Sequence, residues 1–280
     1  MAKQGWASFP HPDKTFDYAG DKLAKAWKTL HAGDQEPFPD DKHVGKVLKA
    51  HPKLGKDAAK IADQLQDAWR AFHRGDFKEA YDAGTALKAL GASVAIKAGG
   101  IHATYLVDSD KEKLMRYEAL AKLAEDAIAA LPDDANSHYR HAFALGRYSQ
   151  CLSITQALAK GIAGKVKTSL DATLELAPKH AEAHTALGLY HAEIVGKVGG
   201  MLAKLTYGAS AAAAEKHLKE ALKLTPDSPI AHVEYANALL LLHGDKKEDE
   251  AAGAYAKAAK LKPRDAIEAL DAAFAREQIE

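Results

Sequence analysis

PKHAEAHTALGLYHAE, residues 178–193, and AEKHLKEALKLTP, residues 214–226, are the two ends of the stretch that decides the fold. Each end has the periodicity of a short helix with one buried face. A proline stands at both limits of the stretch, and proline does not continue a helix. The stretch 178–226 therefore reads as one unit of two helices, and similar units lie on both sides of it.

Three joints in the chain share one layout: an apolar helix end, a proline, a short polar turn and a histidine six residues after the proline. These histidines are His138, His184 and His232. The prolines at 132, 178, 226 and 263 are separated by 46, 48 and 37 residues. Internal repeats of this length indicate an α-solenoid. We expect an all-α fold, with the three equivalent histidines in a packing role.

The first 55 residues have a different character. Trp6, Phe9 and two prolines in residues 1–13 predict an irregular arm that packs onto the body. Residues 16–30 carry apolar side chains at spacings of three and four, which predicts a helix. Regular helices are expected from Asp57 onwards. Gly75 is expected to close one of them in the left-handed conformation and Asp76 to cap the next, which makes a tight turn between the two. We divide the chain into a divergent N-terminal segment, 1–55, and a helical repeat domain, 56–280.

Composition narrows the classes of function. The chain has 38 Lys and Arg and 38 Asp and Glu, so its formal net charge is zero, which argues against nucleic acid as the main partner. Its one cysteine, Cys151, forms no intramolecular disulfide and fits a reducing compartment. No stretch reaches the roughly 20 apolar residues of a membrane span. We expect a cytoplasmic protein with no membrane insertion.

The second helices carry a pattern of small and medium residues ahead of each proline: Ala214, Leu218 and Ala221, then Ala251, Tyr255 and Ala258. With the pair Leu187–Gly188 and the closing proline, this pattern resembles the tetratricopeptide repeat family. The resemblance covers roughly residues 57–270. It implies a right-handed superhelix of helix pairs in which small residues such as Gly188 lie where two helices cross.

Two units are longer than the roughly 34 residues of that family's standard repeat. The extra residues fall between the paired helices, in YSQCLSITQALAKGIAGKV, 148–166, and EIVGKVGGMLAKLTYGAS, 193–210. We expect each insertion to lengthen the first helix and add a glycine-broken turn. Elongated units of this kind also resemble the regulators of microtubule dynamics.

The tetratricopeptide resemblance implies a concave groove lined by the first helices, where a protein or peptide partner docks. The expected groove residues lie just off the packing stripe: Asn136, Tyr139, Phe143, Arg147, Glu182, Thr185, Leu189, Glu193, Asn237 and Leu240. Their mixture of aromatic, aliphatic, amide and charged side chains suits a protein interface. The set lacks the dense Lys and Arg of the family's carboxylate-clamp members, so a chaperone C-terminal tail is not expected as ligand.

We predict a non-catalytic interaction scaffold with no cofactor and no metal site. Three other readings stay open. The insertions fold over the concave face and fill it; or they close a pocket near His184 and His191 that binds a small ligand or a metal ion; or an enzymatic or regulatory site lies around residues 34–41, although no motif supports one there.

Overall fold

A computed structural model describes residues 5–280 of the chain, and within that range it contains helices and no strand. The predicted all-α class is confirmed. The helices, in chain order, are α1 (Lys22–Leu30), α2 (Asp41–Ala50), α3 (Ala58–Arg74), α4 (Phe77–Ala86), α5 (Ala92–Leu106), α6 (Asp110–Ala130), α7 (Ala135–Gln150), α8 (Ile154–Ala159), α9 (Ile162–Leu176), α10 (Ala181–Val198), α11 (Gly200–Tyr207), α12 (Ala211–Leu224), α13 (Pro229–His243), α14 (Glu248–Lys260) and α15 (Ala266–Glu277). None of the helices in residues 5–280 has both the length and the hydropathy of a membrane-spanning segment.

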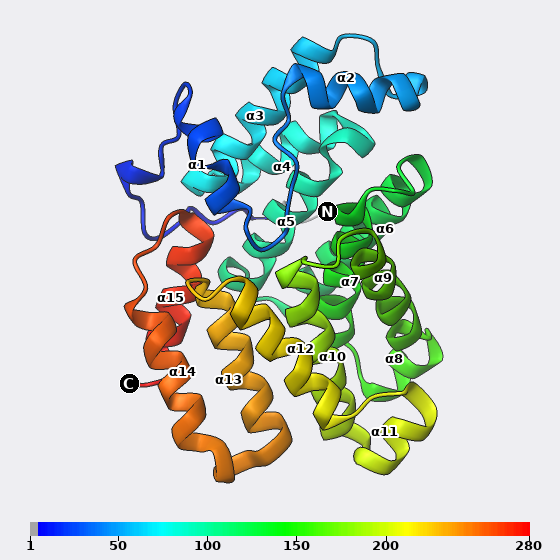
Figure 1. The fold of residues 1–280 in the computed structure, drawn as a ribbon, viewed down its shortest axis with the longest axis vertical. Helices are drawn as coiled ribbons and strands as arrows, with labels where there is room; N and C mark the ends of the chain where they lie inside the picture. Colours follow the sequence, from blue (N-terminus) through cyan, green and yellow to red (C-terminus); the bar gives the residue numbers. More distant parts are fainter. Residues whose placement is uncertain (1–4) are drawn as a thin grey trace.

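Helices that follow one another in the sequence pack as pairs, which is the arrangement of an α-solenoid (Figure 1). The pairs are α3 with α4, α5 with α6, α7 with α9, α10 with α12, and α13 with α14. The short helices α8 and α11 stand inside two of these pairs, in the predicted insertions. Each insertion forms a short helix in place of the expected glycine-broken turn. Helix α10 reaches 18 residues, as predicted, whereas α7 has 16 and ends before most of its insertion.

The joints between pairs repeat one contact. The imidazole Nε2 of His138 lies 2.8 Å from the carbonyl oxygen of Pro132, six residues earlier. His184 makes the same contact with Pro178 at 3.1 Å, and His232 makes it with Pro226 at 2.8 Å. Because a carbonyl oxygen only accepts, Nε2 carries the proton and donates it in all three. The histidine of each joint therefore satisfies a carbonyl group at the turn that separates two units.

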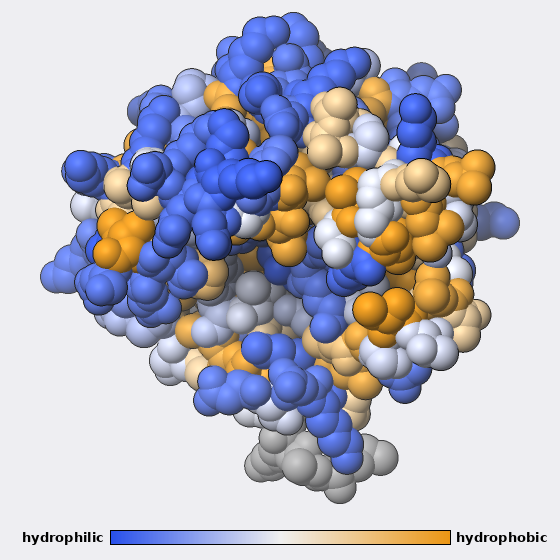
Figure 2. Space-filling view, turned by 90° about the horizontal axis from the view of Figure 1, so that it is seen from below, coloured by the Kyte–Doolittle hydropathy of each residue, from blue (hydrophilic) through white to orange (hydrophobic). Residues whose placement is uncertain are grey.

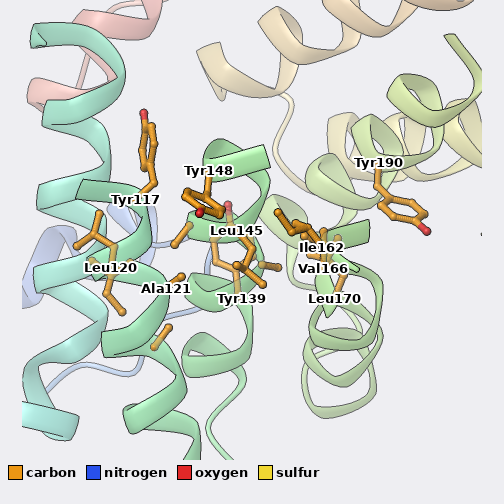
Figure 3. Packing of buried hydrophobic residues seen from close by; sticks show 14 of the residues in the cluster. Tyr117, Leu120, Ala121, Tyr139, Leu145, Tyr148, Ile162, Val166, Leu170 and Tyr190 are labelled. Atoms are coloured by element: carbon orange, nitrogen blue, oxygen red, sulfur yellow. The ribbon is translucent and has the colours of Figure 1, made fainter. Parts of the chain in front are cut away.

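The helix pairs approach closely where residues are small. A Cβ built on Gly188 of α10 would lie 2.5 Å from Cγ of Leu218 and 3.1 Å from the carbonyl oxygen of Ala214, both on α12. The largest core cluster spans α5 to α11, and Figure 3 shows how residues of α6, α7 and α9 contribute to it: Tyr117, Leu120, Leu145, Tyr148, Ile162, Val166 and Leu170. Small residues at the crossings and large ones between them give this core its close packing.

The turns follow their predictions in part. Gly75 ends α3 with φ of 91°, the left-handed conformation that we expected of it. The capping prediction for Asp76 is wrong, because its side chain makes no cap hydrogen bond and pairs with Arg74 at 2.6 Å. The Ser109 side chain caps α6.

The N-terminal segment departs from its prediction in two places. The helix expected from Phe16 begins only at Lys22, since residues 14–16 form a separate 3₁₀ turn. Helix α2 was not predicted at all, although Asp40 caps it and Val44 and Leu48 bury one face of it. The helix was missed because it is short: a loop rich in proline and acidic residues precedes it and Pro52 follows it. Only ten residues of weak periodicity lie between them.

The two ends of the chain meet, as the blue and red segments of Figure 1 show. His73 of α3 contacts the Asp265 carboxylate at 2.7 Å, and the Tyr18 hydroxyl donates to the carbonyl oxygen of Arg264 at 2.6 Å. Ala266 and Leu270 of α15 lie in the same core cluster as Trp27 and Trp69. The C-terminal helix therefore packs against the N-terminal segment, and the row of helix pairs is closed by this contact.

Acidification is expected to lower the free energy of unfolding between about pH 6.5 and pH 4. Burial lowers the pKa of His31, His102 and His180 from 6.5 to about 4 in each case. The unfolded chain binds more protons than the folded chain between these values, so stability falls as the pH falls through this window and this contribution levels off below it. Urea unfolding at a series of pH values measures the slope.

The matched variant for that series is His180→Gln, which removes one of these titrating groups. Its stability should depend less steeply on pH than that of the unchanged chain. An equally steep dependence on pH for the unchanged chain and for His180→Gln would contradict the burial of a neutral His180.

Candidate functional site

The concave side of the solenoid contains a cleft of about 350 Å³. Side chains of α5, α7, α10, α13 and α15 line it, and residues of α8 and α11 stand at its edge. Figure 2 looks at the lower end of the molecule and shows a hollow in the middle of this face, with apolar surface gathered on its right. Residues of the first helices of several pairs thus line one cleft.

Helical periodicity explains why these side chains converge. Residues four apart lie on one face of a helix. Tyr139, Phe143 and Arg147 of α7 follow this spacing, and all three line the cleft. Helix α10 contributes a second row, at spacings of three and four: Glu182, Ala186, Leu189, Glu193 and Lys197. Each first helix thus buries one face in its own pair and turns another face to the cleft.

Most of the predicted groove residues lie in this cleft. Those that line it are Tyr139, Phe143, Arg147, Glu182, Thr185, Leu189 and Glu193. Three lie elsewhere. Asn136 is buried between the N-terminal segment and His180, Asn237 accepts a hydrogen bond from the Tyr255 hydroxyl, and Leu240 is 38% exposed beyond the cleft. The role of these residues in binding stays a prediction.

The polar groups of the cleft are paired with one another. The Arg147 guanidinium lies 3.3 Å from Glu234 of α13. Glu193 accepts from Gln150 at 2.7 Å and from Lys197 at 3.1 Å. These contacts join α7 to α13 and α10 along the polar side of the cleft.

A buried carboxyl group lies at the far end of the cleft. Asp271 of α15 accepts a hydrogen bond from the Tyr105 hydroxyl of α5. Burial, together with the neighbouring charges of Asp265 and Glu268, raises the pKa of the Asp271 carboxyl well above its usual value. This carboxyl and its tyrosine partner therefore link α5 to α15.

The insertions form one wall of the cleft and do not fill it. Ile154, Ala157 and Leu158 of α8 line the cleft, and so does Tyr207 at the end of α11. Gly208 then turns the chain with φ of 62°, a conformation that favours glycine. The remaining lining of this wall is aliphatic and comes from α9 and α10, with Ile162, Val166, Ile194 and Val198. The cleft is therefore apolar on the insertion side and polar on the opposite side.

The N-terminal segment closes the other end of the cleft through a buried ion-pair network. The Asp34 carboxylate is fully buried and lies 2.6 Å from the Lys97 ammonium and 2.6 Å from the Arg140 guanidinium. Glu182 contacts the same two cations at 3.1 and 3.4 Å, so two carboxylates face two cations. Lys97, Arg140 and Glu182 also line the cleft, which places the network at its closed end.

The charge state of this network follows from its contacts. Burial opposes ionisation of Asp34, but the Lys97 ammonium, the His31 ring and the Arg140 guanidinium together outweigh it and hold the pKa of the carboxyl well below its usual value. The neutral His31 ring, stacked on Trp27, lies 2.8 Å from the Asp34 carboxylate. The backbone of the segment is held as well, because Glu182 N–H donates to the Gly33 carbonyl oxygen at 3.0 Å.

The sequence-based description of the concave face missed Lys97 and Arg140. We expected no dense set of Lys and Arg on this face and did not consider these two cations, which pair with Asp34 of the same chain. One signal was available: Lys97 is the only Asp, Glu, Lys or Arg in the apolar stretch 92–107. A lone lysine in such a helix needs a buried partner. The sequence does not reveal that the partner lies 63 residues earlier.

The histidines considered for metal binding make other contacts. His184 Nδ1 lies 2.9 Å from His217 Nδ1 on α12, and the His191 ring stacks on that of His217 with centroids 6.0 Å apart. In residues 5–280 no three His, Cys, Asp or Glu side chains converge as ligands of one metal ion. The pocket near the insertions is the cleft described above, and His184 and His191 do not line it.

The family model described as regulator of microtubule dynamics protein 1-3 matches residues 98–273, which is more than half of the chain. The matched region runs from α5 to α15 and contains most of the cleft lining. No curated protein matches the chain. Of the two families that the sequence resembles, this match supports the regulators of microtubule dynamics. The chain belongs to the regulator of microtubule dynamics protein 1-3 family.

Proposed function

We propose that the chain is a non-catalytic scaffold of the tetratricopeptide type whose cleft binds a protein partner. The observation that supports this most strongly is the convergence of side chains from several helices on one apolar cleft. Aromatic, aliphatic and arginine side chains are the ones that dominate binding energy at protein interfaces. Tyr139, Phe143, Leu189 and Arg147 bring these types together in the cleft.

The pairing of polar groups supports a role in binding without catalysis. A catalytic site needs an acid, base or nucleophile that is free to reach the substrate. In the cleft, Arg147, Glu193 and Asp271 each engage a neighbouring side chain and link two helices. We therefore propose that these groups have a structural role and hold together the helices that form the cleft.

Family membership suggests the setting of the interaction. The name of the family refers to microtubule dynamics. We propose that the chain binds a partner that acts in a microtubule-related process. A cytoplasmic location accords with that setting. The matched residues include both insertions, so the cleft in its present form belongs to the part of the chain that resembles the family.

The test fills the cleft without disturbing the core. Gly146 lies on α7 and lines the cleft, and a Cβ built on it meets no atom within 4 Å. Gly146→Phe should place a ring in the cleft and abolish co-purification of a stoichiometric partner from the native host. The matched control is Gly253→Phe on α14, where a Cβ also meets nothing within 4 Å. Retention of the partner by Gly146→Phe, or its loss from both variants, would contradict binding in the cleft.

A small apolar ligand is the second candidate function, and the shape of the cleft favours it. Clefts of about 300–1,000 Å³ with apolar walls and a few placed polar groups are typical of ligand sites. At about 350 Å³ this cleft lies in that range. An environment-sensitive apolar dye tests the candidate: saturable binding that Gly146→Phe removes and Gly253→Phe keeps supports it, and binding that is equal in both excludes it.

A further inference from the structure

The two insertions have an unusual charge balance. Residues 151–166 and 194–210 contain four lysines and no aspartate or glutamate, whereas the chain as a whole is neutral. Lys160, Lys165, Lys197 and Lys204 are all exposed. Among these four, the ion pairs of residues 5–280 include only Lys197, which contacts Glu193 of α10. The insertions thus present a basic surface.

The same insertions also expose large apolar side chains. Met201 and Leu205 of α11 are 88% and 85% exposed, while Ile154 and Leu158 of α8 are 54% and 52% exposed. Burying one such side chain is worth about 1.5–3 kcal/mol, so leaving several in water is costly. Figure 2 shows apolar surface gathered to the right of the hollow, the side on which Figure 1 places α8 and α11. We call α8 and α11, together with the four lysines of the insertions, the insertion surface.

The insertion surface continues into the cleft. Ile154 and Leu158 are half-exposed and also line the cleft, and Tyr207 lines it from the end of α11. Apolar surface therefore runs from the interior of the cleft over its rim and onto both short helices, with lysines beside it. A partner that covers this surface needs an apolar face and negative charge next to it.

We propose that the insertion surface, together with the adjoining mouth of the cleft, binds an acidic amphipathic helix of a partner protein. The proposal rests on the proposed function and specifies its partner. Apolar side chains of that helix enter the cleft beside Leu158, and its aspartates and glutamates contact the lysines.

The form of the partner follows from the fold. A volume of about 350 Å³ admits several side chains but not a whole helix, so the partner's backbone stays at the mouth. The chain offers no strand in residues 5–280 to which an extended segment could add by backbone hydrogen bonds. A helix that lays its apolar face in a groove is the mode of recognition that fits an apolar rim with side-chain-sized space behind it.

Two other occupants fit the surface less well. A second copy of the chain, docked through the same surface, would set four lysines against four lysines, which is unfavourable. A flat bilayer would reach Met201 and Leu205 but not the parts of Ile154 and Leu158 that face into the recess. An acidic helix satisfies both the charge and the recess.

The experiment measures binding of two labelled helical peptides by fluorescence anisotropy, with the full chain. The peptides share one apolar face of leucines, and one has glutamates where the other has lysines. The glutamate peptide should bind at least about tenfold more tightly, a ratio that corresponds to about 1.4 kcal/mol. Its affinity should fall as the salt concentration rises, because exposed charges are screened.

Matched variants locate the binding. Met201→Gln with Leu205→Gln should weaken the glutamate peptide at least about tenfold, whereas Met115→Gln with Leu176→Gln, at exposed apolar positions on other helices, should not. Lys160→Glu with Lys204→Glu should weaken it similarly, whereas Lys53→Glu with Lys60→Glu, far from the insertions, should not. Urea unfolding of each variant shows that it remains folded.

Three results would overturn the proposal. Equal binding of the two peptides would show that the surface has no preference for negative charge. Equal losses of affinity in the test and control variants would show that the peptide does not bind at the insertion surface. Binding to vesicles of anionic phospholipid, with no binding of the glutamate peptide, assigns the surface to a membrane. If the peptides fail while Gly146→Phe still abolishes co-purification and Gly253→Phe does not, the proposed function stands and only the acidic helix is excluded.

Discussion

Replacing Asp34 by alanine is expected to destabilise the protein by about 3 to 5 kcal/mol, the usual loss when one partner of a buried ion pair is removed. The substitution leaves the Lys97 ammonium and the Arg140 guanidinium buried with one carboxylate, Glu182, between them. It also removes the acceptor of the His31 ring. Urea unfolding followed by circular dichroism measures the loss.

The control for this prediction is Asp126→Ala. Asp126 pairs with Lys122 at 3.0 Å, but both side chains are exposed, so the loss should be small. Asp34→Asn separates charge from shape, because it keeps the side-chain volume and removes the negative charge. It should lose nearly as much stability as Asp34→Ala. Losses of equal size for Asp34→Ala and Asp126→Ala would show that the N-terminal segment is not held by its buried charge.

Replacing Gly188 by alanine is expected to destabilise the protein by about 2 kcal/mol, in the middle of the range for overpacked cores. Alanine is the better helix former, so helix propensity alone predicts a gain of about 1 kcal/mol. The added Cβ would lie 2.5 Å from Leu218 Cγ, which is not the flexible end of that side chain, and 3.1 Å from a backbone oxygen of α12. Relief requires α10 and α12 to move apart.

Gly253→Ala is the matched control, since this residue lies inside α14 and a Cβ on it meets nothing within 4 Å. It should gain stability by about the difference in helix propensity, up to 1 kcal/mol. The opposite signs of the two substitutions are the test, measured as shifts in the urea midpoint. A stabilising Gly188→Ala would mean that α10 and α12 do not cross closely at this residue.

The repeat pattern predicted the solenoid because its signals are local. The prolines mark the joints, and the histidine six residues later donates back to the proline's carbonyl oxygen. Gly188 was expected at a helix crossing because a small residue in an apolar stripe allows close approach. These features depend on neighbours in the sequence or in the next helix, and a reader of the sequence can recognise them.

The N-terminal segment was harder to predict because its decisive contacts span long distances in sequence. Asp34 lies in a loop rich in proline and acidic residues, where a solvated carboxylate is the ordinary expectation. Its partners Lys97 and Arg140 come 63 and 106 residues later. The contact between His73 and Asp265 joins residues that are 192 apart. No local pattern encodes such pairs.

The candidate site was predictable to the extent that helical periodicity determines it. The row of Tyr139, Phe143 and Arg147 follows from their spacing, and all three line the cleft. The role of the insertions did not follow, since 148–166 and 193–210 carry no repeat signal that places them. Asn136 illustrates the limit: it lies three residues before Tyr139 on α7, but the N-terminal segment covers it. Periodicity gives the face of a helix, and the tertiary structure decides what covers that face.

Site-specific photo-crosslinking in the native host tests the central claim, that the cleft and its rim bind a partner protein, most directly. A photoreactive amino acid replaces Ile154, which is 54% exposed and lines the cleft, and in a second strain it replaces Ile279, which is 46% exposed near the C-terminus. We predict a covalent adduct with one protein from position 154 and none from position 279. Adducts from position 279 alone, or the same adducts from both positions, would contradict the assignment of the cleft as the binding surface.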